Sequence, residues 1–145
     1  MHETLSSQME DYLEIIYQLC QENGLARVKD IAARLAVSNP SVVSAIKNLK
    51  TRKLVVQEPY GYIRLTARGN RLAAAVIQKH EVLRSFLEKI LALDPETAAR
   101  DACKMEHAIS AKTLERFTDL MEFVEEAPKG VSRWLDDFSQ TRDQA

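Results

Sequence analysis

Two short helical patterns joined by a tight turn place the strongest constraint on the fold of this chain. Apolar residues recur at helical spacing over residues 27–35, and a three-residue link separates them from Asn39 and Pro40. Asn39 is suited to an N-cap and Pro40 to the first position of a helix that ends near residue 52. The expected inward-facing residues of this helix are Val42, Ala45 or Ile46, and Leu49. Such a pair of helices is typical of a helix-turn-helix motif.

A β-hairpin pattern follows the second helix. Residues 54–58 and 62–65 are strand-like, and Pro59, Tyr60 and Gly61 form the turn between them. We expect this hairpin to be a wing beside the helix-turn-helix.

Helical patterns account for the rest of the chain. They cover residues 7–22, 68–91 (with Gly69 in the first turn), 95–109 and 112–125, and a short helix is expected near residues 131–138. The expected fold is therefore mainly α. A winged helix-turn-helix DNA-binding domain in residues 1–68 is joined by the long helix to a helical dimerisation domain in residues 69–145.

Composition narrows the class of protein further. With 145 residues, 46% hydrophobic and 28% charged, the chain is expected to fold as a globular protein. No apolar run approaches the roughly 20 residues that cross a bilayer, and residues 1–4 lack the features of a signal peptide. We expect a cytoplasmic protein whose two cysteines, Cys20 and Cys103, form no disulfide framework.

The charges of the chain are unevenly distributed. The formal net charge is −1, yet residues 26–70 contain nine Lys or Arg residues against only Asp30 and Glu58. This region therefore carries +7 and the remainder −8. Such a division is expected when one region contacts a polyanion such as DNA and another contacts cations or a partner subunit.

The second helix of the motif is expected to read the major groove, with basic residues nearby on phosphates. Asn, Ser and Lys side chains at its exposed positions can contact base edges. The candidate DNA-binding residues are Arg27, Ser38, Asn39, Pro40, Ser41, Ser44, Lys47, Asn48, Lys50, Lys53, Tyr60 and Arg64.

A possible metal site is visible at Cys103, Glu106 and His107. Residues at positions i, i+3 and i+4 of a helix share one face, so a thiolate, a carboxylate and an imidazole would project together. Asp11 and Glu14 share a face of the first helix by the same spacing, and His80 lies midway along the long helix. A mixture of carboxylate and imidazole with at most one thiolate suits Mn(II) or Fe(II) better than structural zinc. Other divalent transition metals would also bind such a set in vitro.

These residues resemble the diphtheria toxin repressor family of metal-dependent regulators, and most closely its short branch, the manganese transport regulators. The resemblance runs from residues 9–17 through residues 26–35 and the Lys79-His80-Glu81 segment to residues 103–107. It implies a homodimer that binds palindromic operator DNA when its metal is abundant and represses genes for metal-ion uptake.

The resemblance also assigns the metal ligands one by one. Asp11, Glu14, His80, Glu106 and His107 match ligands of the manganese branch, whereas Cys103 stands where that branch has Glu and resembles the iron-responsive branch instead. The implied site is therefore a hybrid. An ancillary site of the iron branch is not expected, because Arg84 and Ala99 replace two of its ligands.

Other functions remain open at this point. A metal-independent winged-helix regulator could bind a small organic ligand, with the acidic residues serving as salt-bridge partners. A small metallohydrolase is disfavoured because no nucleophile, phosphate loop or oxyanion-donor pattern accompanies the carboxylates and His, so we expect no enzyme activity. A purely structural interaction protein would leave the charge division unexplained.

Overall fold

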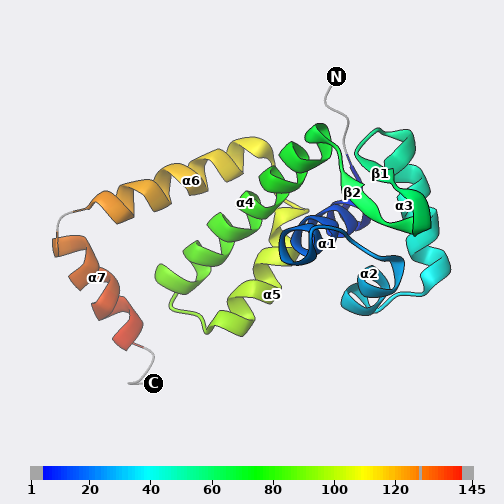
Figure 1. The fold of residues 1–145 in the computed structure, drawn as a ribbon. Helices are drawn as coiled ribbons and strands as arrows, with labels where there is room; N and C mark the ends of the chain where they lie inside the picture. Colours follow the sequence, from blue (N-terminus) through cyan, green and yellow to red (C-terminus); the bar gives the residue numbers. More distant parts are fainter. Residues whose placement is uncertain (1–4, 128, 142–145) are drawn as a thin grey trace. The chain divides into compact units, whose positions relative to one another are not determined.

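The computed structural model describes residues 5–127 and 129–141, without the side chains of residues 129 and 131. The contacts between residues divide the chain into two compact units, Met1–Ile77 and Gln78–Ala145. Figure 1 traces the order of the elements along the chain. Within the described residues, no helix is both long enough and apolar enough to span a membrane.

The first unit is a winged helix-turn-helix, as the sequence predicts. Its elements are α1 (Ser7–Asn23), α2 (Val28–Leu35), α3 (Asn39–Thr51), β1 (Val55–Gln57), the 3-10 turn η1 (Pro59–Gly61), β2 (Ile63–Leu65) and the first part of α4 (Ala67–Lys89). The strands β1 and β2 pair antiparallel, with Val56 opposite Arg64. An isolated antiparallel bridge between Ala26 and Ile63 connects the wing to the segment between α1 and α2.

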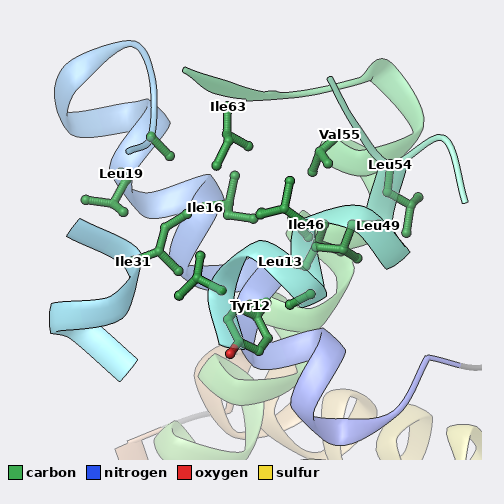
Figure 2. Close-up of a cluster of buried hydrophobic side chains, with 14 of the residues drawn as sticks. Tyr12, Leu13, Ile16, Leu19, Ile31, Ile46, Leu49, Leu54, Val55 and Ile63 are labelled. Carbon is green, nitrogen blue, oxygen red and sulfur yellow. The ribbon is translucent and has the colours of Figure 1, made fainter. Parts of the chain in front are cut away.

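Side chains from three helices and the wing form the core of this unit (Figure 2). Leu13 and Ile16 of α1, Leu49 of α3 and Ile63 of β2 are completely buried. Burying each such side chain contributes about 1.5–3 kcal/mol, so the core fixes both the turn between α2 and α3 and the position of the wing. The expected inward face of α3 is confirmed, because Val42, Ala45, Ile46 and Leu49 are all buried.

Two helix ends differ from the sequence prediction. The N-cap of α3 is Ser38 rather than Asn39, because Ser38 Oγ accepts a hydrogen bond from the Ser41 amide at 3.2 Å. Asn39 is instead the first residue of the helix. The helix α5 ends at Glu106 rather than near residue 109, and His107 is its C-cap. His107 nevertheless keeps helical dihedral angles (φ −85°, ψ −13°), so it continues the course of the last turn.

The second unit consists of helices, again as predicted. It contains the rest of α4, then α5 (Pro95–Glu106), α6 (Ala111–Glu126) and α7 (Lys129–Gln140). Leu83 and Leu87 of α4 pack with Ala98 and Ala102 of α5. The rings of Phe86 and Phe117 add an edge-to-face contact with centroids 4.8 Å apart, which joins α6 to this core.

At Gly69, near the start of α4, there is no room for a side chain. A Cβ atom at this position would lie 2.0 Å from the backbone oxygen of Leu54 and 3.2 Å from Leu65 Cδ2. Gly69→Ala is expected to lower the free energy of unfolding by about 1–3 kcal/mol, because backbone atoms must move. Urea unfolding followed by circular dichroism measures this change. Gly130→Ala is the matched control: nothing lies within 4 Å of its Cβ, so equal losses in both variants would contradict the explanation.

Cys20 is held against the core of the first unit. Its Sγ lies 3.7 Å from the Ile63 carbonyl oxygen, to which it donates, and burial raises the pKa of the thiol despite the opposing effect of Arg64. A raised pKa leaves less reactive thiolate near neutral pH. In a Cys103→Ser variant, iodoacetamide should therefore modify Cys20 more slowly than it modifies the thiol of an unfolded peptide. The increase of the rate with pH should also occur at a higher pH than for the peptide thiol. Mass spectrometry at several pH values tests this, and equal rates before and after unfolding in urea would show that burial does not protect the thiol.

Candidate metal centre and DNA-reading surface

Two apolar helix faces bring polar side chains together in the second unit. On α5, Ala98, Ala102 and Glu106 follow one another at four-residue spacing and are all buried. On α4, His80 precedes Leu83 and Leu87 on one face. The helices α4 and α5 pack side by side and run in opposite directions (Figure 1). The faces that meet through leucine and alanine therefore place His80 against Glu106.

Four predicted ligands form one cluster at this point. His80 Nδ1 lies 3.2 Å from Glu106 Oε2, and His107 Nε2 lies 3.5 Å from Glu106 Oε1. Cys103, Glu106 and His107 each offer a ligand atom, and these atoms lie within 4.8 Å of one another. The cluster therefore combines two imidazoles, one carboxylate and one thiol.

Glu106 is the most confined member of the cluster. Its side chain has no exposed surface, whereas those of His80 and His107 retain 18% and 17%. Among the side chains and backbone groups that the structure describes, none donates a hydrogen bond to Glu106 Oε1. A buried carboxylate oxygen without a donor is energetically costly, and a cation can remove that cost. The residues therefore fit a divalent metal ion, since imidazole, carboxylate and thiolate are its usual ligands.

The other two predicted ligands, Asp11 and Glu14, belong to the first unit. Both are half-buried on α1, one turn apart and on the same face. Glu14 Oε1 accepts a hydrogen bond from Gln18 Nε2 at 3.5 Å. Each unit thus presents a group of potential ligands, one of two carboxylates and one of four mixed donors.

Arg84 lies one turn after His80 on α4 and is held by two carboxylates. It donates to Glu81 Oε2 and to Glu88 Oε1, each at 2.7 Å. The two hydrogen bonds raise the pKa of Arg84. The one from Arg84 to Glu81 also lowers the pKa of the Glu81 carboxyl. A guanidinium so placed neutralises acidic side chains that could otherwise attract a cation.

All twelve predicted DNA-binding residues are exposed, and all of them lie in the first unit. Five of them follow α3 from Pro40 to Asn48 on the side opposite the buried face. The helix contains no acidic residue, and Lys47 and Lys50 give its outer face positive charge. The arrangement can therefore place hydrogen-bonding groups and cations against a polyanion.

The basic residues near the wing already have partners in the protein. The Arg27 guanidinium stands 5.2 Å from the centroid of the Tyr62 ring, and Arg64 forms an ion pair with Glu58 at 3.2 Å. At the tip, Tyr60 is 94% exposed and holds a left-handed backbone with φ 73°. A non-glycine residue in this conformation carries strain, which is common where a side chain must be presented for binding.

Val43 is a surface residue that the sequence analysis did not single out. It is 54% exposed on the outer side of α3, whereas its neighbour Val42 is fully buried. Two shallow hollows border it, one reaching Pro40 and the other reaching Val28 of α2, and Lys47 lines both. The signal in the sequence is its position, three residues after Pro40 and four before Lys47.

Comparison with known proteins places both units in one family. The model described as "Iron dependent repressor, N-terminal DNA binding domain" matches residues 4–63. The model described as "Iron dependent repressor, metal binding and dimerisation domain" matches residues 66–135. Together these matches cover both the helix-turn-helix with its wing and the helices that carry the cluster.

Individual relatives agree with the family models. The chain is 42% identical to "Transcriptional regulator MntR" of Escherichia coli O6:H1 over 109 residues, which are 75% of this chain and 70% of that protein. It is 37% identical to "HTH-type transcriptional regulator MntR" of Bacillus subtilis over 118 residues, which are 81% of this chain and 82% of that protein. The solved structure of the manganese regulator SloR is 30% identical with a TM-score of 0.70, covering 83% of this chain.

The match extends over only 55% of the SloR chain, so this chain spans little more than half of that solved relative. The family consists of transcriptional regulators and is not a class of enzymes. Matches of both units to the two family models, and close relatives over most of the chain, lead to one conclusion. The chain belongs to the diphtheria toxin repressor family of metal-dependent transcriptional repressors, in the branch of the manganese transport regulators.

Proposed function

We propose that this chain represses genes for metal-ion uptake when Mn(II) or Fe(II) is abundant. The observation that carries the proposal is the buried carboxylate of Glu106, which faces His80 and His107 and has an oxygen without a hydrogen-bond donor among the described residues. Burying a charged group in this way costs stability unless a cation or donor compensates it. A divalent cation would satisfy the carboxylate, and the neighbouring imidazoles and thiol complete a suitable ligand set.

The proposed ligands belong to both units of the chain and are Asp11, Glu14, His80, Cys103, Glu106 and His107. When bound, the metal ion supplies positive charge that the carboxylates and the thiolate share. Without that charge, acidic side chains of α1 and of α5 would repel one another on approach, which would oppose their convergence. Glu106 also restrains His80 through their contact at 3.2 Å, so the imidazole is oriented before a metal arrives.

The proposed regulatory step is a shift between arrangements of the chain. Convergence of the ligands would favour the arrangement in which a homodimer offers two α3 helices to successive half-sites of a palindromic operator. Coupling energies of about 1–3 kcal/mol are typical of such regulation and would change DNA affinity by about 5- to 150-fold. A repressor of this kind acts where the DNA is, so we propose a cytoplasmic location.

The central experiment measures operator binding with and without metal. A duplex selected from a random DNA pool in Mn(II) should bind the protein tightly in Mn(II) or Fe(II) and weakly after chelation. Glu106→Gln should abolish this metal dependence, because an amide keeps the shape of the side chain but lacks the charge that a divalent ion requires. Fluorescence anisotropy provides the affinities.

Glu125→Gln is the matched control for that experiment. Glu125 is an exposed partner of Lys89 on α6, so its loss should leave the metal dependence unchanged. Tight binding by the wild-type protein in chelator would refute metal sensing. It would support instead the metal-independent regulator of a small organic ligand, which the family match does not favour.

The role of Cys103 can be tested by replacing the natural metal with Co(II). Direct coordination by the thiolate should produce a sulfur-to-cobalt charge-transfer band in the near ultraviolet, because the softer ligand donates into the metal. The band should disappear in Cys103→Ser and persist in Cys20→Ser, since Cys20 is held by the carbonyl of Ile63 in the first unit. A band of equal intensity in Cys103→Ser would exclude the thiolate from the ligand set.

A further inference from the structure

The outer face of α3 carries a large apolar side chain, Val43, that lies outside the buried core. Val43 is 54% exposed, and the core below it is formed by Val42, which is fully buried. The residues beside it on the same face are polar or basic, with Ser44 next to it and Lys47 one turn on. A single exposed apolar side chain is common on protein surfaces, so the place of Val43 matters more than its exposure: it lies on the face of α3 that is proposed to enter the DNA major groove.

The surroundings of Val43 define what it can contact. The hollow on one side of it is lined by Asn39, Pro40, Ser44 and Lys47, and α3 contains no acidic residue. Val43 is thus surrounded by a positively charged group and a hydroxyl group. Such a surface is complementary to one that is anionic, forms hydrogen bonds and also presents a methyl group. In the DNA major groove, the C5 methyl of thymine is the only apolar group on a base edge.

We propose that Val43 packs against a thymine methyl group and selects thymine at one position of each operator half-site. This inference rests on the proposed DNA-binding function and deepens it by assigning a specificity-determining residue. Lys47 then lies on the same face, one turn further along α3, where it can reach a neighbouring base edge or a phosphate. The contact discriminates against cytosine, which lacks the methyl, without any hydrogen bond from Val43.

Uracil provides a direct test, because it differs from thymine only by the missing methyl group. The probe is the duplex enriched from random DNA by the full chain in Mn(II), with each thymine replaced singly by deoxyuracil. With the wild-type protein, a replacement at one position of either half-site should weaken binding about three- to fivefold, the effect expected for one buried methyl group, while replacements elsewhere have little effect. With Val43→Ser, the thymine and uracil duplexes should bind equally at that position.

Val56→Ser is the matched control, because Val56 is another exposed valine of the first unit (46%) that lines neither hollow. It should keep the discrimination between thymine and uracil. A wild-type protein that tolerates uracil at every position, or a Val43→Ser variant that still discriminates, would overturn the inference. It would also be overturned if Val43→Ser changed the oligomeric state in sedimentation velocity, since Val43 would then contact a second copy of the chain.

These outcomes separate the inference from the function on which it rests. Failure to enrich any duplex in Mn(II) would overturn both. A metal-dependent duplex that binds equally well with uracil at each thymine would overturn only the role of Val43 and leave the repressor function intact.

Discussion

The arrangement of the second unit depends on a carboxylate placed where a hydrophobic residue would be expected. Glu106 continues the alanine face of α5, so the packing of α5 on α4 carries it out of water together with Ala98 and Ala102. His80 stands in the corresponding place on α4, before the leucines that pack on those alanines. The helices therefore assemble at one end through apolar contact and at the other through groups that demand charge compensation. Stability and ligand binding are thus linked in one interface between helices.

Much of this molecule could be predicted from its sequence, because its patterns are local. The turn between α2 and α3, the wing and the first turn of α4 follow from apolar spacing and from Asn, Pro and Gly residues. The N-cap of α3 was misplaced because Ser38 and Asn39 are both good capping residues, and only the backbone decides between them. The end of α5 was placed too late because the apolar spacing continues through Ile109, although the backbone leaves the helix after Glu106.

The sequence predicted which residues form the cluster, but not how deeply the Glu106 carboxylate is buried. The spacing of Cys103, Glu106 and His107 indicated a shared face, and their ligand atoms do lie close together. No sequence pattern revealed that Glu106 would be fully buried with an oxygen that has no donor within the described part of the chain, since that depends on the neighbouring helix. Val43 was overlooked for a similar reason. Exposure of a single valine between two hollows depends on how α2, α3 and the wing pack, whereas helical spacing shows only that the position faces outward.

The helices α2 and α3 are each closed at their C-terminal end by a residue with a left-handed backbone. Ala36 (φ 53°) closes α2, and Lys53 (φ 59°) closes α3, with the Leu54 amide donating to the Leu49 carbonyl at 3.0 Å. The C-terminal ends of α2 and α3 both have the paired backbone hydrogen bonds of a Schellman motif, which set where each helix stops independently of the exposed side chains. The outward residues of α3 can therefore be replaced without changing the length of the helix. A new operator preference could arise by exchanging these side chains while the backbone of α3, and the domain around it, stayed the same.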